Sequence, residues 1–114
     1  MAPIKQFEVW IADLNPRRGT EPGKVRPVLI VQTNFLNQIH PSILICPITT
    51  NIIDASKILR VHLKKREAGL KEKSDILIDQ VRAIDKKRLV RRQGKVPTKY
   101  VAQVKDGLKA VLDL

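Results

Sequence analysis

The chain has 114 residues, a length that suits one domain over residues 1–114, and its hydrophobic content of 43% argues against disorder. Its 22 lysine and arginine residues against 11 aspartate and glutamate residues give a net charge of +11, which predicts a polyanionic partner such as a nucleic acid, an anionic membrane or an acidic protein segment. A membrane is the weakest of these, because no apolar run approaches the ~20 residues that span a bilayer.

Apolar runs predict five or six short strands. The first covers residues 7–14, with Phe7, Val9 and Ile11 on one face and Trp10 on the other. A polar loop of roughly a dozen residues follows, well above the usual ~4–6, and loops of such length are usually functional or mobile. Further strands are expected at residues 27–33, 43–47, 58–63, 75–82 and 89–93.

Two helices are expected between and after these strands. A short one covers residues 85–89, with Asp85 as its N-cap. The second begins near Thr98, because apolar residues from Val101 to Leu112 recur at helical spacing. Residues 34–42 and 64–74 are expected to connect strands. Without an alternating βαβ pattern, the sum predicts a mainly β fold with a C-terminal helix, a small antiparallel barrel.

Several kinds of site are excluded or weakly supported. The single cysteine, Cys46, rules out an internal disulfide and a cysteine zinc site, and its apolar neighbours predict a buried, inert thiol. His40 and His62 have no partner at ligand spacing, so we expect no metal and no cofactor, and His62 should be a solvated strand residue. Aromatic residues make up only 4%, too few for a base-stacking module. The N-terminal segment has no apolar stretch typical of a signal peptide, which predicts a cytoplasmic protein.

Two stretches combine polar side chains with strand ends. Arg26 stands where the polar loop enters the apolar run 27–31, and Pro27 after it favours extended geometry. Thr49 follows the apolar run 43–48. RNA offers a reaction for such residues, because its 2′-hydroxyl can attack the adjacent phosphorus without metal or cofactor. A guanidinium binds phosphate oxygens bidentately, and a hydroxyl can donate to a phosphate oxygen or orient the nucleophile.

The same stretches carry a pattern that covers nearly the whole chain in order. It comprises Val9-Trp10, Leu14-Asn15-Pro16, Gly19, Glu21, Gly23, Arg26-Pro27-Val28-Leu29-Ile30-Val31-Gln32, Pro47-Ile48-Thr49 and Asp79-Gln80-x-Arg82-x-Ile84-Asp85. This pattern resembles the MazF/PemK toxins. The resemblance implies a homodimer with an SH3-like barrel and a ribosome-independent, sequence-specific endoribonuclease, the toxin of a type II toxin–antitoxin pair. It also implies 2′,3′-cyclic phosphate and 5′-hydroxyl ends.

The resemblance assigns roles residue by residue. Arg26 and Thr49 fall on the catalytic arginine and threonine of the family. One branch uses the aspartate at position 79 in catalysis together with an arginine and a histidine, but here Leu77 and Thr20 stand at those positions, which favours the Arg/Thr version. Arginine stays protonated, so the residue that takes the proton remains open. RNA-binding or supporting roles are expected for Glu21, Lys24, Gln32, Thr50, Asp79, Gln80 and Arg82.

The expected partners are single-stranded RNA and an antitoxin whose acidic, disordered segment lies on the basic runs 64–73 and 86–92. DNA binding is expected only non-specifically or through the antitoxin. Two alternatives remain. One is a non-catalytic toxin of the same fold that acts on a protein such as DNA gyrase. The other is a basic RNA-binding module without activity.

Overall fold

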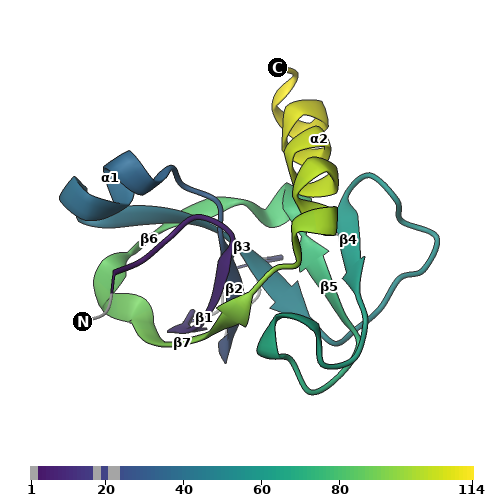
Figure 1. The fold of residues 1–114 in the computed structure, drawn as a ribbon, viewed down its shortest axis with the longest axis horizontal. Coiled ribbons are helices and arrows are strands. Elements are labelled where there is room, and N and C mark those ends of the chain that lie inside the picture. The colour runs from purple at the N-terminus through teal and green to yellow at the C-terminus, as the bar shows by residue number, and fades with distance from the viewer. Residues whose placement is uncertain (1–2, 17–18, 21–23) are drawn as a thin grey trace.

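The computed structural model describes residues 3–16, 19–20 and 24–114, and these residues form a mainly β fold with a C-terminal helix (Figure 1). The strands are β1 (Glu8–Asp13), β2 (Val25–Ile30), β3 (Ser42–Thr49), β4 (Arg60–Leu63), β5 (Ser74–Leu77), β6 (Arg82–Asp85) and β7 (Leu89–Lys95). The helices are α1 (Asn34–Ile39) and α2 (Val101–Leu112). Short 3₁₀ turns are η1 (Glu67–Gly69), η2 (Ile78–Gln80), η3 (Lys86–Arg88) and η4 (Thr98–Tyr100).

Strand β3 is the centre of the sheet. It pairs antiparallel with β2 along one edge and with β5 and β6 in succession along the other. The strand order is β4-β5-β3-β2-β1-β7, with β6 off this path. Within the described residues no ladder joins β4 to β7, so the sheet curves but is not closed into a barrel by hydrogen bonds.

A three-residue excursion separates β5 from β6. Ile76 lies opposite Ile48, whereas Arg82 lies opposite Ile45. The chain therefore advances six residues from β5 to β6 while the facing strand β3 advances only three. The three additional residues are accounted for by η2, which interrupts what would otherwise be one long strand. Such irregularities bend a strand and re-aim its side chains, and they are common beside functional sites.

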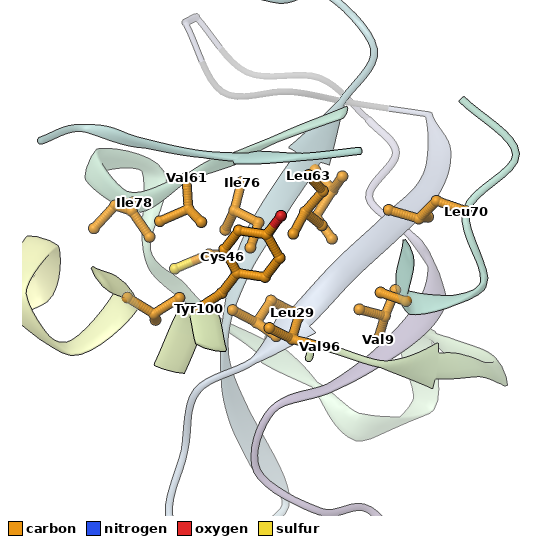
Figure 2. Close-up of a cluster of buried hydrophobic side chains, with 13 residues drawn as sticks. Val9, Leu29, Cys46, Val61, Leu63, Leu70, Ile76, Ile78, Val96 and Tyr100 are labelled. Atoms are coloured by element: carbon orange, nitrogen blue, oxygen red, sulfur yellow. The ribbon is translucent and has the colours of Figure 1, made fainter. Parts of the chain in front are cut away.

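The first hydrophobic core lies between the sheet and α2. It gathers apolar side chains from β1 to α2, and Tyr100 lies among them (Figure 2). Helix α2 contributes Val104, which is fully buried, and packs against η2 and β4. Cys46 is fully buried in the same cluster, as the sequence predicts. Burial of this kind stabilises the folded state by about 25 cal/mol for each Å² of apolar surface removed from water. Because α2 packs against η2, this burial also stabilises the position of η2.

A second core occupies the other face of the sheet. Alternation along the strands fills it with Trp10, Ala12, Leu14, Val28, Ile30, Ile43, Ile45, Ile84 and Leu89. Val9 and Trp10 thus point into different cores, as the predicted alternation requires. Because residues of β2 and β3 serve both cores, these two strands are buried on both faces.

Two glycines allow β7 to cross close to η1. A Cβ built on Gly94 would lie 2.4 Å from the Ala68 carbonyl oxygen, and one on Gly69 would lie 2.3 Å from the Gln93 carbonyl oxygen. Gly69 also has a φ of +75°, a backbone conformation that favours glycine. The Gln93 side-chain amide donates to the Gly69 carbonyl at 2.7 Å, which fastens the crossing.

The remaining elements correct parts of the sequence prediction. The expected helix at residues 85–89 is the 3₁₀ turn η3 between two strands, although the Asp85 carboxylate does cap it by accepting from the Lys87 N–H at 2.8 Å. The expected connector at residues 34–42 contains the helix α1. The expected strand at residues 75–82 is divided by η2.

Candidate functional site

Arg26 and Thr49 lie on adjacent strands. The pairing of β2 with β3 ends at Val28 and Pro47, and Arg26 and Thr49 each lie two residues beyond that pair on their own strand. Because side chains alternate along a strand, both lie on the face that carries Val28 and Pro47. Each is half-buried, so each is positioned by the sheet and still reaches the surface. The two residues that the sequence assigns to catalysis therefore lie on the same face of adjacent strands.

The Thr49 hydroxyl is oriented by the backbone that follows it. Its Oγ1 accepts a hydrogen bond from the Asn51 N–H at 3.1 Å. This bond occupies a lone pair of the oxygen and leaves the hydroxyl hydrogen to donate elsewhere. A phosphate oxygen is one group that could accept from it.

A cleft of about 400 Å³ lies beyond η2. Its lining residues come from four segments of the chain: Thr20, Ile53, Ser56, Leu59, Arg60, Leu77, Asp79 and Gln80. Asp79 is exposed and Gln80 is half-buried, because the η2 excursion lifts them out of the strand. Two further predicted site residues thus share one cleft.

The cleft also contains the two positions at which the sequence departs from the aspartate-using branch. Thr20 and Leu77 line it together with Asp79. A hydroxyl and an aliphatic side chain supply neither the imidazole nor the guanidinium of that branch. Leu77 is also nearly buried, at 7% exposed. The cleft therefore offers no acid–base pair built on those positions.

Asp75 of β5 is a buried carboxylate that the sequence analysis did not single out. It lies directly opposite Thr49 in the sheet and is fully buried. Arg60 and His62, its neighbours across β4 and β5, both contact it, so His62 is not the solvated residue that the sequence predicts. Burial by itself raises the pKa of Asp75, but hydrogen bonds from the Ile53 N–H, His62 and Arg60 outweigh it and hold this pKa below its usual range.

The thiol of Cys46 is fully buried in the first core. Burial raises its pKa to about 12, and the negative charge of Asp79 contributes in the same direction. A buried thiol with such a pKa is a poor nucleophile, because the thiolate is the reactive form.

The other predicted site residues are spread over the sheet. Lys24 and Thr50 are exposed next to Arg26 and Thr49 in sequence, and Arg82 is half-buried opposite Ile45. Gln32 lies beyond the opposite end of β2 and is 6% exposed, and its amide nitrogen donates to the Asn37 side chain at 3.0 Å. Its polar groups are thus used inside the protein, so the structure does not bring Gln32 to the site. Glu21 lies outside the described residues.

Two features are absent from the described part of the chain. Residues 3–16, 19–20 and 24–114 contain no group of three His, Cys, Asp or Glu side chains arranged to hold a metal ion. In the same part of the chain, no helix is both long enough and apolar enough to cross a membrane.

Comparison with known proteins identifies the family. Residues 5–112 match the family described as the PemK-like, MazF-like toxin of type II toxin–antitoxin systems. The chain belongs to the PemK/MazF toxin family. An endoribonuclease MazF of Staphylococcus epidermidis is 34% identical to it over 97% of this chain and 92% of the relative.

Solved structures support the fold. MazF of Deinococcus radiodurans superposes with a TM-score of 0.85 at 21% identity, and all of both chains is covered. A mycobacterial endoribonuclease, solved in complex with its cognate antitoxin, superposes with a TM-score of 0.77 at 19% identity over 100% of this chain and 97% of that one. The mainly antiparallel sheet with its C-terminal helix is therefore the fold of PemK/MazF toxins.

Proposed function

We propose that this PemK/MazF family member is a toxin that cleaves single-stranded RNA at specific sequences without a metal ion. The observation that supports the proposal is the antiparallel pairing of β2 with β3, since Arg26 and Thr49 each lie two residues beyond its last pair and on the same face. The 34% identity to an endoribonuclease over nearly the whole chain supports the same reaction class. The net charge of +11 suits a polyanionic substrate.

In the proposed reaction the substrate supplies the nucleophile. The 2′-oxygen forms a bond to the adjacent phosphorus while the bond from phosphorus to the 5′-oxygen breaks. The 2′-hydroxyl loses its proton and the 5′-oxygen gains one, which leaves a 2′,3′-cyclic phosphate and a 5′-hydroxyl. Arg26 stabilises the charge on the pentacoordinate phosphorus and donates a hydrogen bond to the leaving oxygen, which takes its proton from solvent water. Thr49 donates to a non-bridging oxygen and fixes the phosphate. Neither residue takes the proton from the 2′-hydroxyl, because a protonated guanidinium has no acceptor and a neutral hydroxyl is a very weak base. In the proposed reaction this proton passes to solvent water.

Asp79 and Gln80 are proposed to contact bases. A carboxylate repels the phosphate backbone but accepts hydrogen bonds from the amino groups of bases. The side-chain amide of Gln80 can both donate and accept. Their common cleft would hold an unstacked base next to the scissile phosphate, which gives the enzyme a means of sequence selection.

Partners follow from the same proposal. The mycobacterial relative has been solved with its cognate antitoxin, and we propose that this chain is likewise inhibited by an antitoxin with an acidic, disordered segment. The exposed lysines and arginines of residues 64–73 suit such a segment. We also propose that the chain acts as a homodimer in the cytoplasm, which size-exclusion chromatography with light scattering and cell fractionation would test.

The deciding experiment incubates the purified protein with a long single-stranded RNA in EDTA and maps the cut ends. Arg26→Ala and Thr49→Val are run alongside. Matched controls are Arg91→Ala, an exposed arginine opposite Ile11 in the ladder of β1 and β7, and Thr33→Val, an exposed threonine whose side chain makes no cap hydrogen bond.

We expect discrete cuts with 5′-hydroxyl ends in the wild type and both controls, and no cuts in Arg26→Ala or Thr49→Val. Intact RNA across substrates that cover most short sequence motifs would refute the proposal. A non-catalytic toxin that acts on a protein such as DNA gyrase, or an RNA-binding module without activity, would then be the better hypothesis.

A further inference from the structure

Asp75 makes hydrogen bonds through both of its carboxylate oxygens. Its Oδ1 lies 2.6 Å from Nδ1 of His62. Its Oδ2 accepts from Nη1 of Arg60 at 2.9 Å and from the Ile53 N–H at 3.0 Å. This side chain is fully buried, so its charge must be met inside the protein.

The partners of Asp75 also hold the segment that joins β3 to β4. Arg60 Nη1 donates to the Asn51 carbonyl at 2.7 Å, and Nε2 of His62 lies 2.8 Å from the Ser56 carbonyl. With the bond from the Ile53 N–H, the segment 51–56 is attached to the sheet at three points. The segment has no helix or strand of its own, so these bonds define its path.

The attached segment contacts two parts of the candidate site, the cleft and Thr49. Ile53, Ser56 and Arg60 line the cleft that contains Asp79 and Gln80. Asn51 is held at its carbonyl by Arg60, and its N–H donates to the Thr49 hydroxyl. A chain of hydrogen bonds thus runs from Asp75 through Arg60 and Asn51 to Thr49.

The ring of His62 bridges β5 and the segment 51–56. Its Nδ1 faces the Asp75 carboxylate and its Nε2 faces the Ser56 carbonyl. The other charged groups of the surrounding elements are Arg60 on β4, Asp75 on β5, and Asp54 and Lys57, which are exposed in the joining segment.

We infer that Asp75 is a positioning residue for RNA cleavage, which acts through Arg60 and His62 to hold the segment 51–56 as a wall of the cleft and to orient Thr49. The inference rests on the proposed function. A role of Asp75 in stability alone explains its contacts less well, because a buried ion pair is a weak source of stability compared with apolar packing. All of the protein groups that Asp75 organises also lead to the cleft or to Thr49.

The test measures kcat and KM on a short RNA that contains one mapped cleavage site. Asp75→Ala should lower kcat about 10²-fold, the effect of misplacing a reacting group by roughly 1 Å. The matched control is Glu8→Ala, which removes another buried carboxylate, bonded to Arg92 at 2.6 Å and to the Trp10 indole at 3.1 Å. Glu8→Ala should lower the unfolding temperature while kcat of the folded protein stays at the wild-type value.

Asp75→Asn gives a readout that lost stability cannot imitate. Its side-chain oxygen can still accept from Arg60 and Ile53, so this variant keeps the attachment of the segment 51–56 that Asp75→Ala loses. Asp75→Asn should therefore keep more of the wild-type kcat than Asp75→Ala. Glu8→Gln and Glu8→Ala should both keep the wild-type kcat.

Hydrogen exchange separates the possible failures. If Asp75 holds the segment, the Ile53 amide should exchange at least tenfold faster in Asp75→Ala than in Glu8→Ala. Wild-type cleavage combined with unchanged kcat, cut sites and Ile53 exchange in both Asp75 variants would overturn the inference and leave the proposed function standing. Intact RNA with the wild-type protein would overturn the proposed function, and the positioning role in cleavage with it.

Discussion

The crossing of β7 over η1 should make Gly94→Ala strongly destabilising for a purely steric reason. An added Cβ would lie 2.4 Å from the Ala68 carbonyl oxygen, 2.5 Å from its carbon and 2.9 Å from the Gly69 nitrogen, whereas ordinary contacts begin at 3.4 Å. All three atoms belong to the backbone, so no side chain can rotate away. Either η1 or β7 must therefore move by about 1 Å.

The expected loss is about 3 kcal/mol, at the upper end of the range for overpacking. For a domain of this size that corresponds to roughly 12 °C in the unfolding temperature. Gly19→Ala is the matched control, because a Cβ there would meet nothing within 4 Å and the substitution only strains a φ of +56°. The strain should cost about 1–2 kcal/mol.

Thermal unfolding followed by circular dichroism, with urea unfolding at 25 °C, would measure both variants. Gly69→Ala combines the two effects, since its Cβ would lie 2.3 Å from a carbonyl oxygen at a φ of +75°, and it should be the least stable of the three. A Gly94→Ala protein as stable as Gly19→Ala would show that β7 and η1 adjust freely, and the steric reasoning would be wrong.

Further predictions concern ionisable groups. The hydrogen bond from Tyr100 at 2.6 Å is the main cause that lowers the pKa of Glu67 to about 2. Tyr100→Phe should therefore raise the pKa of Glu67, which an NMR titration would measure. The same variant should be less stable by about 1.5–3 kcal/mol at pH 7, as measured by urea unfolding. Because the pKa values of Glu67 and Asp75 are lowered on folding, their contributions are complete above about pH 4.5 and should be lost as the pH falls towards 2, which a urea midpoint series would detect. Burial, followed by the Glu67 bond, raises the pKa of Tyr100 to about 12, so its contribution should fade as the pH rises from 10 to 12. Cys46 should react with a thiol reagent only at the rate of unfolding, and fast labelling of the native protein would contradict its burial.

The strands were predictable because their apolar residues follow a simple period, and α1 was missed because its residues do not. Phe35 and Ile39 of this short helix are 70% and 66% exposed, while its buried residue is the polar Asn37. The helix therefore has no apolar face that a periodicity argument could detect. Its position depends on hydrogen bonds between Asn37 and Gln32, which are specific to the folded chain.

The interruption between β5 and β6 also could not be predicted from the sequence. The apolar run of Ile76, Leu77 and Ile78 is typical of one continuous strand, and only the two registers along β3 show where the chain leaves the sheet. Similarly, the sequence predicts that His62 lies on a strand, but its partner Asp75 depends on how β4 and β5 pair. Arg26 and Thr49 were predictable as candidates, since each marks the end of an apolar run. That they lie on adjacent strands could be seen only from the pairing of β2 with β3.

The excursion at η2 has a consequence for how such a toxin can diversify. A residue inserted within β5 would turn every later side chain of that strand to the opposite face, because the period of a strand is two. The same insertion within η2 would leave the pairings of Ile76 and Ile84 with β3 unchanged. Length at this point can therefore vary independently of the sheet. Chimeras that exchange the residues of η2 between toxins should keep the fold while they carry a different lining of the cleft with them.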